Sequence, residues 1–503
     1  MRTSISGRHL LAGVVGTAFI ATSGAVWAQE AGAETAELQQ MVEEVLRQNA
    51  AMQEKIQNLE HELARARDDA RAARDLAQAS AARPAAGYEA GGAPLASRPL
   101  GGAKAQLLDV SLDVMTAAGS STATDEQLQD LQGGGHDPRQ RGFTLQQVEL
   151  SFLGAVDPYF TGEAHVIYVL DAEGESRVEL EEAFATTQRL PFGLEGQGVQ
   201  LETGTFFTEY GRLNPTHAHA WDWQDQPVVN TRFFGEDGMR GPGLRVGWLT
   251  PLPWFSELHL GVQNGKGETM VSFLANDEVF EERPIGGRPS VERSVSGFQD
   301  LVYLARWVNG FDVSDTLSAQ LGVSGLYGPN TTGSDGWTAI YGADLVAKWR
   351  PLTSDRGWPF VTFQTEFSGR SYHADRFFGC VGEPAPCANP VSADSDTLED
   401  WGFYSQILWG FRRNWAAGFR VEYASGSGDG FDPETGTFVS RDEDPYRDDR
   451  LRLSPLLVFH PSEFSRLRLQ FNYDDAKHLP KRDAYSVWAG LEFLFGAHAA
   501  HAY

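Results

Sequence analysis

Apolar and polar residues alternate with a period of two along most of the chain, from about residue 107 to residue 495. One example is the run 466–473, in which Leu467, Leu469, Phe471 and Tyr473 alternate with Arg466, Arg468, Gln470 and Asn472. Successive side chains of a β-strand point to opposite faces, so each such run predicts a strand with one apolar and one polar face. This region therefore predicts an all-β fold.

Sixteen candidate strands can be counted in this region. They begin near Leu107, Gly142, Tyr159, Arg177, Gly198, Gly243, Phe255, Gln299, Ser314, Gly336, Trp358, Leu398, Trp415, Asp449, Ser465 and Ala484. Compact connections such as 413–414 alternate with long polar ones such as 208–242 and 265–298. Short turns at one rim and long loops at the other are typical of outer-membrane barrels. We therefore expect a transmembrane antiparallel β-barrel of about 16 strands over residues 106–496.

Aromatic residues support this interpretation because they cluster near the predicted strand ends. They are Trp254, Phe255, Trp307, Trp349, Trp358, Trp401 and Trp415. Aromatic girdles at both membrane interfaces are a feature of such barrels. We expect these residues to form them.

The period changes to 3.5 between residues 34 and 79. Leu38, Val45, Met52 and Leu59 share one heptad position, and Asn49 lies at the other seam position. This pattern predicts an N-terminal helical coiled coil. A single amphipathic helix folded back on its own domain is the alternative. Residues 80–105 are rich in Ala, Gly and Pro, which predicts a flexible linker.

The first 28 residues predict a secretory signal peptide. Arg2 and Arg8 precede an apolar run, and Val26-Trp27-Ala28 resembles a cleavage site. An uncleaved anchor is the alternative. An even number of strands would then leave both chain ends in the periplasm, with residues 497–503 as a solvated tail. We expect the protein in the bacterial outer membrane, in contact with its lipid.

Charge and cysteine content narrow the choice of partners. The formal net charge is −27, which should repel nucleic acid, so we expect no nucleic-acid partner. The only cysteines are Cys380 and Cys387, in a Gly- and Pro-rich stretch. In an oxidising periplasm such a pair favours a disulfide over a metal or redox role.

The polar faces of the strands carry many ionisable residues, which cannot lie unpaired in a dry core. We predict that the pore is lined by Glu163, His165, Glu179, Glu181, Glu202, Asp344, Lys348, Arg350, Glu366, Arg370, Arg412, Arg420, Arg452, Arg466 and Arg468. Acidic residues dominate the early strands and arginines the late ones, so a transverse field across the lumen is expected. Salt bridges that brace the wall are an equally good interpretation of any one residue.

The segment 206–242 has the most unusual composition, and as an inserted loop it would narrow the lumen. We predict that this constriction loop presents Tyr210, Arg212, His217, His219, Trp221, Asp222 and Trp223. His217 and His219 are two residues apart, so in extended backbone they point the same way and a divalent metal can bridge them. Asp222 is a candidate third ligand. Hydrogen-bonded loop packing is the favoured alternative to a metal site.

The chain resembles the porin superfamily of Gram-negative outer membranes, most closely the phosphate-selective porin type. The resemblance rests on the signal peptide, the coiled-coil leader, and the runs 143–152, 157–160, 181–184 and 204–212. It implies a homotrimer of sixteen-stranded barrels, each with a loop folded inward. In this chain the coiled coil and the barrel walls would hold the trimer together.

These patterns together predict a porin through which small hydrophilic solutes or ions diffuse passively, without cofactor or enzymatic activity. A receptor or channel for a divalent metal or metal complex, built on the His217 and His219 loop, is the main alternative. A secreted β-protein and a lipid hydrolase are weaker alternatives, since the sequence contains no Gly-x-Ser-x-Gly motif for a nucleophile.

Overall fold

The computed structural model describes residues 108–170, 174–276, 279, 283–381, 390–432 and 435–496. The predicted signal peptide, coiled coil, linker and C-terminal tail lie outside these residues, as does Cys387 of the predicted disulfide. Among the described residues, no helix has the length and apolar content needed to cross a membrane.

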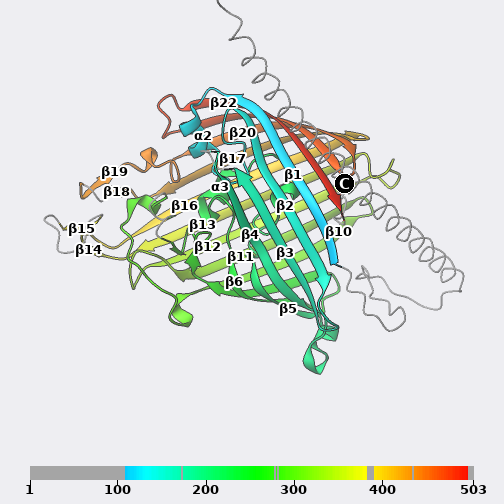
Figure 1. The fold of residues 1–503 in the computed structure, drawn as a ribbon, viewed down its shortest axis with the longest axis horizontal. Helices are drawn as coiled ribbons and strands as arrows, with labels where there is room; N and C mark the ends of the chain where they lie inside the picture. Colours follow the sequence, from blue (N-terminus) through cyan, green and yellow to red (C-terminus); the bar gives the residue numbers. More distant parts are fainter. Residues whose placement is uncertain are drawn as a thin grey trace, which may run out of the picture. The chain divides into compact units, whose positions relative to one another are not determined.

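The described residues fold as one closed antiparallel barrel of sixteen strands. These strands are β1 (Leu108–Ser121), β2 (Gly142–Ala155), β3 (Phe160–Leu170), β4 (Ser176–Thr187), β5 (Val199–Phe207), β6 (Arg240–Leu249), β7 (Phe255–Asn264), β10 (Leu301–Ser314), β11 (Leu317–Pro329), β12 (Trp337–Trp349), β13 (Phe360–Ala374), β16 (Asp396–Arg412), β17 (Trp415–Ser427), β20 (Arg450–Ser462), β21 (Ser465–Ala476) and β22 (Asp483–Gly496). Each strand pairs with its neighbours in the chain, and β1 closes the ring on β22, with Ser111 opposite Gly496. Figure 1 shows the tilted ring of strands. The predicted barrel class is confirmed, and every predicted strand start lies within three residues of the observed one.

Shorter elements lie in the connections. They are the helices α2 (Asp125–Leu131) and α3 (Val228–Phe234), the 3-10 turns η1 (Pro191–Gln197), η2 (Ala218–Ala220), η3 (Ile285–Gly287), η4 (Phe298–Asp300) and η5 (Arg441–Glu443), and the strand pairs β8 (Lys266–Gly267) with β9 (Leu274–Ala275), β14 (Phe377–Gly379) with β15 (Val391–Ala393), and β18 (Gly430–Asp432) with β19 (Thr437–Val439). All three strand pairs belong to connections at the long-loop rim, beyond the ends of β7, β13 and β17.

Alternation along the strands separates an apolar outside from a polar inside. On β21, Leu467 and Leu469 are exposed outside, whereas Arg466, Arg468 and Gln470 are buried. The same alternation continues on β22, where Val487 and Leu491 are exposed and Glu492 is fully buried. The outside therefore has the apolar character of a surface that faces lipid.

Exposed aromatic residues lie near both rims of the barrel. At the long-loop rim they include Tyr303, Tyr327, Tyr341, Trp401 and Tyr485, and at the short-turn rim Trp254, Phe255, Phe311, Trp349, Trp409 and Phe411. The prediction that Trp358 belongs to an aromatic girdle was wrong. This side chain is only 4% exposed and packs in an internal cluster with Trp223 and Phe360. A turn at the short-turn rim directs Trp358 into the barrel.

Candidate functional site

The segment 208–239, which joins β5 to β6, lies inside the barrel and is called here the lumen segment. Its first residues bind the wall formed by β11 and β13. The Tyr210 hydroxyl donates to Ser368 Oγ at 3.1 Å, and the Arg212 backbone N–H donates to Glu366 Oε2 at 3.0 Å. Gly211 has a φ of 61°, and a Cβ there would lie 1.9 Å from Glu366 Oε1, so only glycine fits.

Helix α3 and a second loop fill part of the lumen with apolar side chains. All seven residues of α3 are buried, and the Val228 backbone N–H donates to Glu422 Oε2 at 2.7 Å. Phe233 and Phe234 of α3 pack against Met270 and Phe273 from the connection after β7. In Figure 1, α3 appears within the ring of strands. Two segments therefore lie in the lumen, of which the sequence predicted one.

Arginines from β17, β20 and β21 hold the middle of the lumen segment. This arginine wall consists of Arg420, Arg450, Arg452, Arg466 and Arg468, all of them buried. Asp225 of the lumen segment pairs with Arg420 and, at 3.1 Å, with Arg452 Nη1. Burial would raise the pKa of Asp225, but these guanidiniums outweigh burial and lower the pKa to about 2.

The same wall also binds the backbone of the lumen segment. Arg466 Nη2 donates to the His219 carbonyl at 2.7 Å, and Arg468 Nη1 donates to the Trp223 carbonyl at 3.0 Å. Glu492 of β22 balances both arginines, at 3.0 Å from Arg468 Nη2. These arginines therefore serve as donors to fixed partners and do not form an open ladder of cations.

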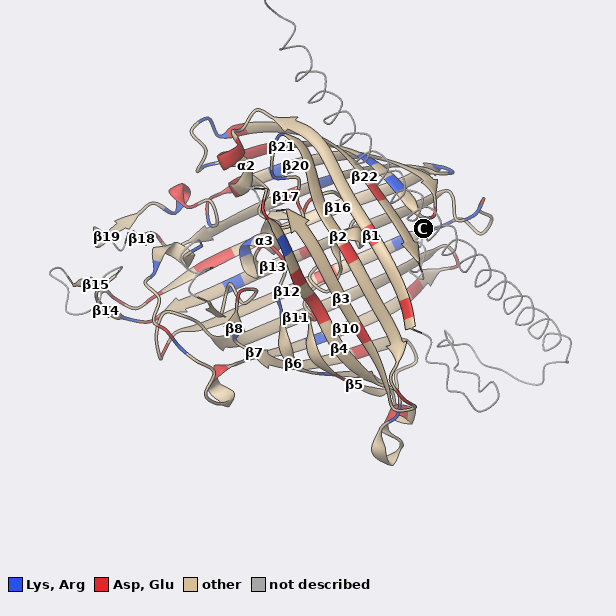
Figure 2. Cartoon of the chain, viewed as in Figure 1, with Lys and Arg blue, Asp and Glu red and all other residues tan. Residues whose placement is uncertain are grey.

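A second part of the lumen wall, on β2, β3 and β4, carries histidines and carboxylates. This histidine cluster consists of Glu149, Glu163, His165, Glu181, Glu182, His217 and His219. Its carboxylates come from β2, β3 and β4, along which Figure 2 shows acidic positions. Glu149 is at its centre, with His165 Nδ1 2.9 Å from Oε1 and His219 Nδ1 2.9 Å from Oε2.

His217 connects the lumen segment to three carboxylates of the cluster. Its Nε2 lies 2.9 Å from Glu182 Oε2, and its Nδ1 lies 2.9 Å from Glu181 Oε2 and 3.5 Å from Glu149 Oε1. Burial would lower the pKa of His217, but the surrounding carboxylates outweigh burial and raise the pKa well above the usual imidazole value. Within the described residues, the ion pairs of Glu149, Glu181 and Glu182 are all made with imidazoles.

A β-bulge on β4 explains why two consecutive glutamates face the lumen. His165 is opposite Glu182 while Val166 is opposite Leu180, so Glu181 is the extra residue. Glu181 and Glu182 are both buried. A bulge re-aims a side chain in this way, and bulges are common next to functional sites.

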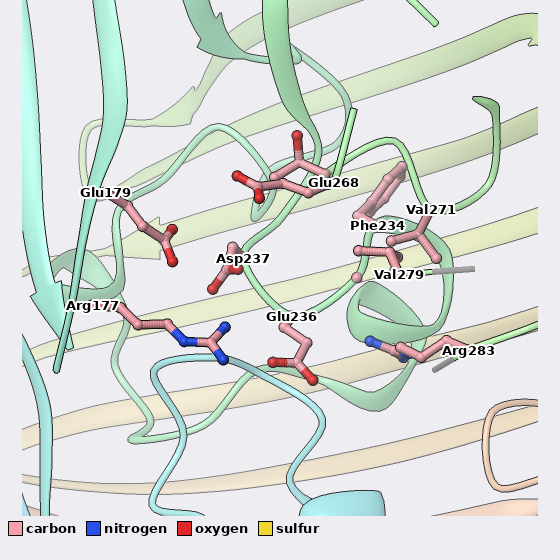
Figure 3. Close-up of a pocket in the computed structure, with 11 residues that line it drawn as sticks. Arg177, Glu179, Phe234, Glu236, Asp237, Glu268, Val271, Val279 and Arg283 are labelled. Carbon is pink, nitrogen blue, oxygen red and sulfur yellow. The ribbon is translucent and has the colours of Figure 1, made fainter. Parts of the chain in front are cut away.

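Small cavities lie inside the barrel, and one of them is lined by Glu181 of the cluster. At the long-loop side a cavity of about 110 Å³ is lined by Glu179, Asp237 and Glu268, and Figure 3 shows their side chains with Arg177 around it. A cavity of about 10 Å³ shares Asp237 with it and also contacts His136 and Glu181. Beyond it, a cavity of about 150 Å³ is lined by Arg212, Asp222 and Arg420, and shares Leu213, Thr216 and Trp221 with the narrow one.

The structure places most of the predicted lining residues on the inner face. His165, Glu181, Asp344, Glu366, Arg370, Arg420, Arg452, Arg466 and Arg468 are buried there. Glu163, Glu179 and Glu202 are partly exposed in contact with His165, Arg240 and Arg245. Lys348, Arg350 and Arg412 are exposed near the short-turn rim. Their roles in conduction stay predictions.

All the predicted constriction-loop residues belong to the lumen segment. Tyr210, Trp221 and Trp223 are buried, and Arg212, His217 and Asp222 are intermediate. Asp222 lines the 150 Å³ cavity, whereas the carboxylate that joins His217 and His219 is Glu149.

Sequence reasoning missed the partners Glu149, Glu182, Asp225 and Glu492. Glu149 and Glu492 alternate with apolar neighbours on their strands, so the period of two contained a usable signal for both. Glu182 is hidden by the bulge, and Asp225 lies in irregular backbone, where no period exists.

Comparisons with known proteins give few close matches. No family model matches the chain. A relative from Aquifex aeolicus (strain VF5), described only as an uncharacterized protein, is 28% identical over 422 residues, which cover 79% of this chain and 80% of the relative.

Similar solved structures include an outer membrane channel, DcaP of Acinetobacter baumannii, with 10% identity and a TM-score of 0.46, covering 78% of this chain and 97% of that chain. An anion-selective porin from Comamonas acidovorans has 8% identity and a TM-score of 0.44, covering 78% of this chain and 100% of that chain. The fold of this chain rests on its own strand pairing and not on these distant likenesses.

Proposed function

We propose that this protein is an outer-membrane channel through which small hydrophilic solutes or ions diffuse passively. The observation that carries the proposal is the closed ring of sixteen strands, counted over the described residues, with apolar residues outside and ionisable residues inside. Barrels of this strand number enclose an aqueous lumen. The proposal assigns the chain no enzymatic role.

The outer surface supports insertion in a membrane. Leu321, Val323, Ile407 and Phe419 are each more than 40% exposed at mid-strand positions around the ring. An apolar surface that continues around a whole barrel would be in contact with water in a soluble protein, at a high cost in free energy. Aromatic side chains at both rims fit the two membrane interfaces.

The lumen supports a narrow passage for small solutes. The lumen segment reaches from the histidine cluster to the arginine wall and therefore occupies part of the lumen. We expect the lumen segment to exclude large solutes. We place the short-turn rim, where β1 begins and β22 ends, in the periplasm.

Conductance of the purified full-length protein in planar lipid bilayers tests the proposal. We expect discrete current steps, and a reversal potential in a salt gradient that reports the preferred sign of charge. The boiled protein is the control, because loss of the barrel should abolish the steps. Folded protein that inserts into bilayers without any current would contradict the proposal.

We also propose that barrels associate through the wall formed by β2 to β5. A shallow groove of about 590 Å³ on this wall is lined by Phe152, Phe184 and small residues such as Gly162 and Ala164. Small residues allow a close approach of a second copy within a membrane. We expect Ala164→Trp to convert a trimer to monomers in native mass spectrometry, while Ala343→Trp on the exposed face of β12 does not. A wild-type monomer would contradict this.

A further inference from the structure

We propose that Glu149, His217 and His219 form a binding site for a divalent transition-metal ion of the Zn²⁺ class. One ligand atom from each residue lies within 4.8 Å of the other two. Glu149 projects from β2, and both histidines come from the lumen segment, so the site would join the segment to the wall. Binding does not require conduction, and the inference therefore goes beyond the proposed channel function.

The geometry needs only small side-chain shifts to accept a metal. Glu149 Oε2 lies 2.9 Å from His219 Nδ1, and Glu149 Oε1 lies 3.5 Å from His217 Nδ1. Ligand atoms about 2.0–2.2 Å from a tetrahedral Zn²⁺ ion are separated by little more than 3 Å. The two imidazole rings are neighbours, with centroids 5.6 Å apart, and one ring nitrogen of each lies within 4.8 Å of the other.

Neighbouring groups already hold the ligands in place. If His217 binds through Nδ1, its Nε2–H donates to Glu182 Oε2 at 2.9 Å, the carboxylate–histidine arrangement that orients metal ligands. The His219 backbone is held by Arg466, which donates to its carbonyl at 2.7 Å. Ser151 Oγ donates to Glu149 Oε1 at 2.9 Å.

An independent observation points to a missing partner beside this site. His136 is 3% exposed, and neither ring nitrogen has a hydrogen-bond partner among the described residues. Its Nε2 faces Glu181 Oε1 at 3.9 Å, and both side chains line the cavity of about 10 Å³. Buried polar groups normally have partners, so a ligand or water is expected there. Glu181 Oε2 lies 2.9 Å from His217 Nδ1, so Glu181 connects this space to the proposed ligands.

Two cavities lie next to the site. The cavity in Figure 3 shares Asp237 with the narrow cavity, which reaches His136 and Glu181. Glu181 contacts His217, so these cavities reach the neighbourhood of the proposed ligands.

The chemistry of the ligands selects the class of metal. Two imidazoles with a carboxylate suit Zn²⁺, Co²⁺, Ni²⁺ or Cu²⁺, whereas Ca²⁺ and Mg²⁺ prefer sites made of oxygen ligands. Hydrogen-bonded packing of the loop without a metal is the competing explanation of the same contacts. The two explanations differ in whether Zn²⁺ binds at one equivalent per chain.

Isothermal titration of the purified full-length protein in detergent with ZnCl₂, and separately with CaCl₂, tests the proposal. We expect one Zn²⁺ per chain and no comparable Ca²⁺ binding. His219→Ala and Glu149→Gln should each weaken Zn²⁺ binding by about 100-fold or more, and Glu182→Gln by roughly 10- to 100-fold. Co²⁺ should give the visible absorption of a tetrahedral site in the wild type and lose it in His219→Ala.

The matched control is His259→Ala. His259 also lies inside the barrel, with Nε2 3.6 Å from Glu257. Among the described residues it belongs to neither of the two groups of His and Glu side chains that could hold a metal ion. It should bind Zn²⁺ as the wild type does. Heat-modifiable gel mobility checks that each variant folds. If His219→Ala does not fold, the Zn²⁺ affinity of Glu149→Gln, which keeps the size of the side chain, tests the proposal. Absence of stoichiometric Zn²⁺ binding, equal binding by wild type and Glu149→Gln, or equal affinity for Ca²⁺ would each overturn the proposal.

Discussion

The lumen segment is held at two sides of the barrel by different chemistry. At the arginine wall, Asp225 binds guanidiniums, which keep their charge at any pH at which the protein is folded. At the histidine cluster, His217 and His219 contact carboxylates through imidazoles, which are also suitable ligands for a metal ion. One side is suited to permanent attachment, and the other also carries the groups of the proposed metal site.

Two buried groups, Asp225 at the arginine wall and His136 beside the histidine cluster, differ in how their hydrogen bonds are satisfied. Asp225 accepts from Arg420, Arg452, Gln470 Nε2 at 2.8 Å and Asn472 Nδ2 at 2.8 Å. His136, beside the histidine cluster, has two buried ring nitrogens without hydrogen bonds within the described residues. Complete satisfaction favours a rigid attachment, whereas an incomplete network leaves room for a ligand.

The largest effect is expected from Asp225→Ala. Two buried guanidiniums, Arg420 and Arg452, would lose a shared counter-charge, which costs about 3–5 kcal/mol. We expect a lower thermal midpoint and a higher single-channel conductance as the lumen segment is released. Asp222→Ala in the same segment is the control. A greater loss of stability in Glu149→Ala than in Asp225→Ala would reverse the comparison.

Acid should weaken the arginine wall by a smaller amount. The pKa of Asp225 is lowered from 3.8 to about 2, so its contribution to stability is complete above about pH 4. That contribution, roughly 2 kcal/mol, is lost as the pH falls through about 2. Thermal unfolding at pH 7, 4, 3 and 2 measures it. In Asp225→Ala the thermal stability should fall less between pH 4 and pH 2 than in the wild type. An equal fall in both proteins would contradict the lowered pKa of Asp225.

The smallest effect is expected from Tyr210→Phe, which removes a neutral attachment. The lost hydrogen bond to Ser368 leaves the Ser368 hydroxyl with one partner fewer, at a cost of about 1 kcal/mol. Thermal unfolding measures this change, and Tyr303→Phe, at an exposed hydroxyl near the rim, is the control. If Tyr210→Phe lowered the free energy of unfolding as much as Asp225→Ala does, the charged contact of Asp225 would be no stronger than the neutral contact of Tyr210.

The sequence predicted the barrel well because its strands obey a local rule. Leu467 and Arg468 differ in polarity and are neighbours, so one window of residues reveals both faces. The partners within the lumen follow no local rule. Glu149 and His219 are 70 residues apart, and Trp223 and Ser454 are 231 apart, so only the closed ring brings them together.

Local exceptions account for the remaining differences. The bulge at Glu181 shifts the register by one residue, which a strict period of two cannot represent. The prediction for Trp358 was wrong for a similar reason, because the turn before β13 directs the ring inward, where it packs with Phe360.

Closure of β1 on β22 has a consequence for assembly in the cell. One edge of β1, the first strand of the barrel, stays unpaired until β22, the last strand of the barrel, has been synthesised. Until then both terminal strands present open hydrogen-bonding edges, which invite aggregation. A polypeptide truncated before Asp483 would lack β22 and leave one edge of β1 unpaired, so we expect it to stay insertion-incompetent.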